Sequence, residues 1–103
     1  MFIQRVRIYP APGKGEEFRT ALEELVKKLQ GQGLATSLSE QLYSPEGATF
    51  VSSTKFRDLA EVESRRRQLR ADRTYQAAVV KISSLTRAPA KWELYEVLVN
   101  YPS

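Results

Sequence analysis

The hydrophobic residues of this chain switch between strand-like and helix-like spacing, and the order of the switches limits the folds that it can form. Alternating or β-rich segments, typical of strands, lie at 1–10, 34–43, 48–56 and 91–101. Helical spacing runs from 16 to 30, and again from Asp58, a good N-cap, to just before Pro89. The second helical stretch is expected to break near 71–74, where Asp72 can cap a new segment.

The β-α-β-β-α-β order predicts an α+β protein of ferredoxin-like βαββαβ topology, in which a four-stranded antiparallel sheet carries two helices on one face. Residues 1–103 are expected to form a single domain. The final strand is apolar on both faces, with Trp92 and Leu94 on one and Tyr95 and Val97 on the other. Because the helices cover only one face, we expect the other to pack against the sheet of a twofold partner, which gives a homodimer.

The composition excludes several kinds of site. The chain has no cysteine and no histidine, which removes disulfides, thiolate nucleophiles, the commonest metal ligand and the usual general base near neutral pH. We therefore expect no metal site and no cofactor. No apolar run approaches the roughly 20 residues that span a bilayer, so a cytoplasmic protein with no membrane partner is expected. The net charge of +4 is modest and is typical of a solvated surface.

Five residues are candidates for binding a small ligand, while no catalytic residue is identified. Arg5, Arg7 and Tyr9 share one side of the first strand. If that side faces the helices, two guanidiniums border a cleft and can hold a carboxylate or phosphate. The alternative, which common cross-strand charge pairs favour, is that they bind acidic residues of a neighbouring strand or the partner subunit. Tyr75 follows the predicted helix break and Trp92 begins the last strand, so each can present a polar hydrogen at the mouth of a cleft.

A basic stretch from Arg65 to Arg73 has two interpretations. With continuous helical spacing, Arg66, Arg70 and Arg73 share one face and could contact phosphates. A solvated outer face, balanced by the glutamates just before it, is the favoured interpretation.

Three stretches carry a resemblance to a known family. They are Arg7-Ile8-Tyr9 with Pro12-Gly13-Lys14 and Phe18, then Arg70-Ala71-Asp72-Arg73-Thr74-Tyr75-Gln76-Ala77, and finally Glu93-Leu94-Tyr95-Glu96-Val97-Leu98. In order and spacing the chain resembles the dimeric α+β barrel superfamily and, within it, the NIPSNAP-like proteins. The resemblance implies a homodimer whose sheets meet face to face, with a ligand cleft between each sheet and its own helices.

Several functions remain open at this point. The first is a NIPSNAP-like protein that binds a small aromatic or anionic ligand in the cleft, and the second is a cofactor-independent monooxygenase or isomerase of the same superfamily. A structural or regulatory dimer without a ligand is another. The βαββαβ topology is also that of RNA-binding modules of the RRM type, in which Phe2 and Phe50 would stack on bases. Ala48 and Glu46 replace residues that the RNA motif requires, so nucleic acid is not the expected partner.

Overall fold

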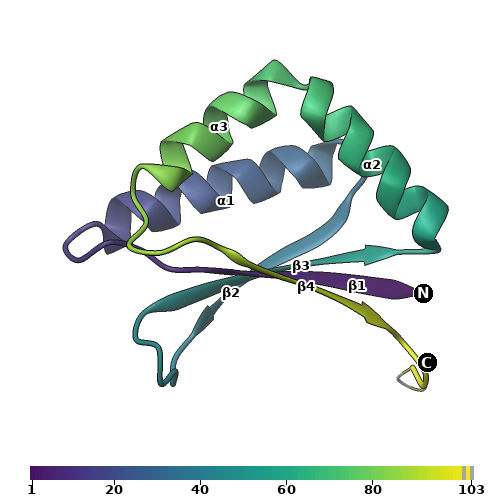
Figure 1. Ribbon diagram of the computed structural model, residues 1–103, viewed down its shortest axis with the longest axis horizontal. Coiled ribbons are helices and arrows are strands. Elements are labelled where there is room, and N and C mark those ends of the chain that lie inside the picture. Colours follow the sequence, from purple (N-terminus) through teal and green to yellow (C-terminus); the bar gives the residue numbers. More distant parts are fainter. Residues whose placement is uncertain (101, 103) are drawn as a thin grey trace.

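The computed structural model describes residues 1–100 and 102. Its elements are β1 (Phe2–Ile8), α1 (Gly15–Gly31), β2 (Ala35–Gln41), β3 (Thr49–Phe56), α2 (Leu59–Ala71), α3 (Arg73–Ser83) and β4 (Lys91–Glu96). The strands form an antiparallel sheet in the order β2-β3-β1-β4, and the helices lie together on one face of it (Figure 1). The predicted α+β, ferredoxin-like arrangement is confirmed. In the described part of the chain, no helix combines the length and the apolar character needed to cross a bilayer.

The second long helical stretch is divided at Asp72, as its capping signal predicts. The Asp72 carboxylate accepts a hydrogen bond of 3.0 Å from the backbone N–H of Tyr75 and so caps α3. The two helices meet at an angle above the sheet (Figure 1). Arg73 therefore belongs to α3, while Arg66 and Arg70 belong to α2. The expectation that these three arginines share one helical face is wrong, because the extended backbone of Asp72 interrupts the helix between them.

The last strand is shorter than the predicted range of 91–101. It spans Lys91–Glu96, and the N–H of Val97 then donates one further bond of 2.9 Å to the carbonyl of Met1. In the described structure β4 pairs with β1 alone, and β1 begins at Phe2. Tyr101, which the prediction included in this strand, lies outside the described residues.

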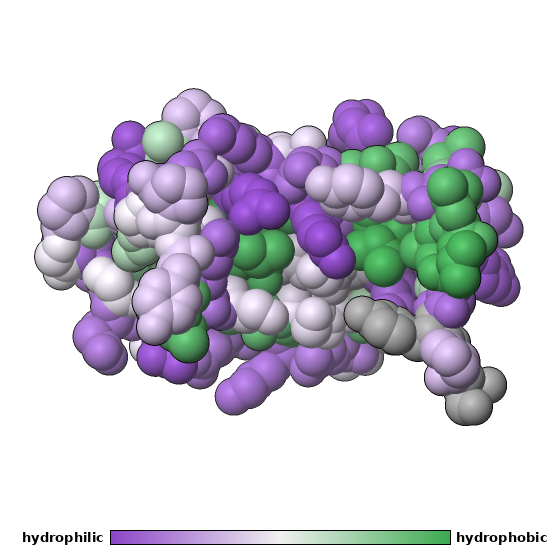
Figure 2. All heavy atoms as spheres, turned by 90° about the horizontal axis from the view of Figure 1, so that it is seen from below, coloured by the Kyte–Doolittle hydropathy of each residue, from purple (hydrophilic) through white to green (hydrophobic). Residues whose placement is uncertain are grey.

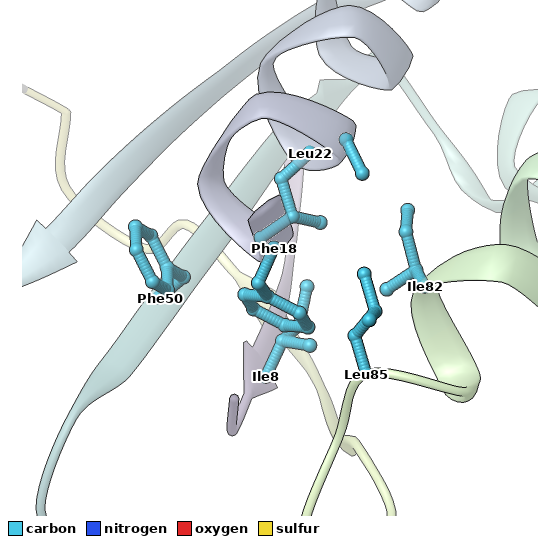
Figure 3. Packing of buried hydrophobic residues seen from close by; sticks show 7 residues of the cluster. Ile8, Phe18, Leu22, Phe50, Ile82 and Leu85 are labelled. Atoms are coloured by element: carbon cyan, nitrogen blue, oxygen red, sulfur yellow. The ribbon is translucent and has the colours of Figure 1, made fainter. Parts of the chain in front are cut away.

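The core consists of two hydrophobic clusters at opposite ends of the sheet. The larger one includes Phe18, which is fully buried, and Phe50, whose ring centroid lies 5.5 Å from that of Phe18. Its members are Ile8, Phe18, Ala21, Leu22, Phe50, Ile82 and Leu85 (Figure 3). The smaller cluster consists of Leu34, Phe56 and Val62. Phe50 and Phe56 lie at opposite ends of β3, so each anchors one cluster. The residues of β3 between them on the inner face, Ser52 and Thr54, belong to neither cluster.

Candidate ligand-binding site

A cleft of about 970 Å³ opens between the inner face of the sheet and the α2–α3 bend. This volume falls at the upper end of the range that holds small-molecule ligands, roughly 300–1,000 Å³. The sheet contributes Gln4, Val6, Ile8, Ser52, Thr54, Phe56, Trp92 and Leu94. The helices contribute mostly apolar side chains, among them Leu22, Leu25, Val26, Leu29, Leu69, Tyr75, Val79 and Ile82. The side chain of Trp92 on β4 is 63% exposed, because the helices pack mainly over β2 and β3 and leave this edge open.

The floor of the cleft is polar at its centre. The strand register sets Gln4 of β1 between Thr54 of β3 and Leu94 of β4. Thr54 donates a hydrogen bond of 3.0 Å to the hydroxyl of Thr36 on β2, which is buried. The Gln4 amide and the Ser52 hydroxyl, by contrast, have no side-chain hydrogen bond within the described part of the chain. Hydrogen-bonding capacity on this floor is therefore unused by the protein itself.

Two aromatic side chains that the sequence singles out, Tyr75 and Trp92, both line this cleft. Tyr75 lies in the first turn of α3 and is half-buried, and this burial raises the pKa of its phenol, which stays protonated at neutral pH. Trp92 lies on the inner face of β4, in register with Val6 of β1. An apolar surface with a phenolic O–H and an indole N–H at its margin suits a flat organic molecule.

The cleft has a basic rim. Arg65, Arg66 and Arg70 of α2 line it. Arg87 and Glu93 also border it, but their charged groups are bound elsewhere, that of Arg87 at Tyr9 and Pro10 and that of Glu93 at Arg7. Arg66 lies 3.7 Å from Glu63 in an exposed pair, whereas no ion pair involves Arg70 in the described structure. Such exposed pairs are weak, so the α2 side of the cleft keeps a positive potential that favours an anionic group.

Arg5 and Arg7 lie on the opposite, outer face of the sheet. Arg7 donates two hydrogen bonds of 3.1 Å each, from Nε to Glu93 Oε1 and from Nη1 to Gln41 Oε1. The Arg5 guanidinium lies 5.5 Å from the centre of the Tyr95 ring. The condition for these arginines to border the cleft is not met, because strand alternation turns them away from Gln4. Arg7 instead forms the cross-strand pair with an acidic residue that the alternative predicts. The hydrogen bond from Tyr95, together with Arg7, lowers the pKa of Glu93.

Tyr9 is buried outside the cleft, in a cluster that joins three segments of the chain. Arg87 and Lys91 lie over its ring at 5.4 and 5.7 Å from the centroid. Arg87 also donates a hydrogen bond of 2.8 Å to the carbonyl of Pro10. Lys91 forms an ion pair of 2.7 Å with Glu46, and this contact lowers the pKa of the Glu46 carboxyl. These contacts hold the β2–β3 loop against the start of β4, so the role of Tyr9 in this structure is to pack this cluster together.

The outer face does not offer the stacking surface of an RNA-recognition module. Phe50 is only 4% exposed and packs against Phe18, and Phe2 packs against the smaller core cluster. Both lie on the inner face of the sheet, so bases cannot stack on them. The residues that the sequence did not single out, Gln4 and Ser52, do carry a local signal. Each places a polar side chain on the strand face where alternation calls for an apolar one.

Comparisons with known proteins find relatives by structure alone. No protein-family model matches the chain, and no curated protein sequence matches it. The crystal structure of a NIPSNAP domain protein from Burkholderia xenovorans superposes with a TM-score of 0.78 at 16% identity, over 100% of both chains. The likeness is one of fold. A proposed antibiotic biosynthesis monooxygenase from Deinococcus radiodurans gives 0.76 at 17% identity, again over 100% of both.

A further antibiotic biosynthesis monooxygenase gives a TM-score of 0.73 at 16% identity, over 96% of this chain and 100% of the other. The chain thus shares its fold with these three proteins, in agreement with the ferredoxin-like topology that the sequence predicts.

Proposed function

We propose that this protein binds a small, flat, anionic organic molecule in the cleft between its sheet and its helices. The aromatic body of the ligand contacts Tyr75 and Trp92, and its negative group binds at Arg66 and Arg70. The observation that carries the proposal is the combination of an apolar cleft of about 970 Å³ with an arginine rim. Apolar walls supply most of the affinity of such a site, and a few charged groups orient the ligand.

Binding, rather than acid–base catalysis, is the function that the cleft residues support. Arginine stays protonated in proteins, burial raises the pKa of Tyr75, and the hydrogen bond from Tyr95 lowers the pKa of Glu93. None of these described titratable residues is tuned to accept a proton near pH 7, as a general base requires. The monooxygenase names belong to the structural relatives, and we do not extend that activity to this chain.

The binding proposal can be tested with 2-naphthoate, a planar apolar ring system with one carboxylate, by isothermal titration calorimetry. The double variant Arg66→Gln/Arg70→Gln should bind it about 5–10-fold more weakly, because each exposed charge contact contributes up to about 1 kcal/mol. The matched control Arg67→Gln/Arg73→Gln removes the same charge from arginines that do not line the cleft, and it should change the affinity less than twofold.

Two outcomes would count against the site. Equal losses in the two double variants would mean that only the overall charge attracts the probe. Failure of the wild-type protein to bind 2-naphthoate at millimolar concentration would reject this class of ligand.

We also propose that the protein forms a homodimer through the outer face of its sheet. Figure 2 displays apolar groups among the hydrophilic residues of this face, gathered toward the end where the chain terminates. Leu98 and Val99, which follow β4, are 86% and 91% exposed, and Tyr95 on the outer face of β4 is also exposed. Contiguous exposed apolar residues of this kind are typical of protein interfaces.

A further inference from the structure

Gln4 lies where the structure of the sheet calls for an apolar side chain. On β1 the residues that face the helices are Phe2, Gln4, Val6 and Ile8, and the other three pack on the two core clusters or belong to them. Gln4 is half-buried and lines the cleft. A polar group in such a place costs stability unless something hydrogen-bonds to it.

The other glutamines of the chain behave differently. Each of them has a side-chain hydrogen bond in the described structure, even where it is exposed: Gln30 to Thr36, Gln32 to Asp72, Gln41 to Arg7 and Tyr43, Gln68 to Arg65, and Gln76 to Leu69. The amide of Gln4 has none among the residues described. Its neighbour Thr54 makes no side-chain hydrogen bond to it in the described structure, and the Thr54 hydroxyl donates to Thr36 on its other side. The unused amide therefore faces the cleft.

We infer that Gln4, together with Ser52, is a specificity-determining residue that hydrogen-bonds a hydroxyl or carbonyl group on the ring of the ligand. The inference rests on the proposed function and adds a second polar group to its ligand. An amide both donates and accepts, and so does a serine hydroxyl, which suits a neutral oxygen substituent. Ser52 is the diagonal cross-strand neighbour of Gln4, at roughly 7–8 Å, so one substituent can lie between the two side chains.

The position of this floor also fixes where the substituent must be. Arg66 and Arg70 come from α2 above the cleft, whereas Gln4 and Ser52 come from the sheet beneath it. A ligand that reaches both carries its anionic group at one end and its hydroxyl or carbonyl at the other. An analogue without the second group leaves the Gln4 amide unpaired and should bind less tightly.

A matched pair of probes tests this directly. 2-Naphthoate and 6-hydroxy-2-naphthoate share the ring system and the carboxylate, and they differ by one hydroxyl at the far end. By calorimetry the wild-type protein should bind the hydroxylated probe about fivefold more tightly, which corresponds to one net hydrogen bond. Gln4→Leu should bind the two probes equally. Gln41→Leu, the same substitution on the outer face, should keep the wild-type preference.

The outcomes separate this inference from the proposed function. Equal binding of both probes by the wild-type protein overturns the inference and leaves the proposed function standing, since 2-naphthoate still binds. If Gln41→Leu also loses the preference for the hydroxylated probe, the inference is overturned, because the loss would then not be specific to Gln4. Binding of neither probe contradicts the proposed function and the inference with it. Ser52→Ala, a small change at a half-buried position, is the second variant, and an undiminished preference there removes Ser52 from the site.

Discussion

Replacing Gln4 with leucine should make the unliganded protein more stable, even though it impairs recognition. A buried amide without a partner costs roughly 1–3 kcal/mol, and the partial exposure of Gln4 reduces this to about 1 kcal/mol. Leucine removes that cost and adds contacts to Val6 and Leu94, which flank the position. For a domain of this size, about 1 kcal/mol raises the Tm by roughly 4 °C.

The matched control is the same substitution at Gln41. Its amide oxygen accepts a bond of 3.1 Å from Arg7, and its amide nitrogen donates one of 2.9 Å to the carbonyl of Tyr43. Gln41→Leu breaks both and should lower the free energy of unfolding by about 1 kcal/mol. Thermal and urea unfolding followed by far-UV circular dichroism measure both variants, at one protein concentration because self-association also shifts the Tm.

The two substitutions are therefore expected to move the Tm in opposite directions. A fall in the Tm of Gln4→Leu comparable to that of Gln41→Leu would refute the reasoning. It would mean that the Gln4 amide is already satisfied in the free protein and holds no capacity in reserve for a ligand.

Three further predictions concern the core, the helix break and the outer face. Phe18→Ala should lower the free energy of unfolding by about 3–5 kcal/mol in urea titrations, because Phe18 is fully buried; a loss below about 1 kcal/mol would contradict its place in the core. The hydrogen bond from the Tyr75 N–H lowers the pKa of Asp72 from 3.8 to about 2. The ionised Asp72 carboxylate therefore stabilises the folded protein fully above pH 3.8, and this contribution is lost as the pH falls through about 2. The Tm of Asp72→Asn should accordingly vary less than that of wild type across this range, and parallel profiles would argue against the cap. Val97→Asp should dissociate the proposed dimer in sedimentation experiments while Val80→Asp, on the exposed side of α3, does not; a monomeric wild type at micromolar concentration would reject the dimer.

Local signals in the sequence predict the elements of this fold well. Alternation places Phe2, Val6 and Ile8 on one face of β1, and the structure has them there. Asp72 marks the division between α2 and α3 because a capping carboxylate acts on a backbone N–H only three residues away. These features depend on neighbours in the sequence, so they can be inferred without knowledge of the fold.

The site depends on contacts that no local pattern contains. Whether Arg5 and Arg7 face the helices is decided by which side of the sheet the helices cover, and both arginines lie on the other side. The polar floor arises because the register brings Gln4 beside Thr54, some fifty residues along the chain. The end of β4 likewise lies where its pairing with β1 ends. The helix break and the start of the last strand predict Tyr75 and Trp92 as cleft residues, and the fold brings both to the cleft.

The most direct test of the proposed cleft is a titration of ¹⁵N-labelled protein with 2-naphthoate, followed by two-dimensional NMR. Trp92 is the single tryptophan of the chain, so its indole N–H gives one unambiguous signal. Binding in the cleft predicts saturable shifts of that signal and of the backbone amides of Gln4 and Tyr75, with little change at Ser39 on the outer face of β2. Shifts confined to the outer face, or no saturable shift at the Trp92 indole, would contradict the central claim that the ligand binds between sheet and helices.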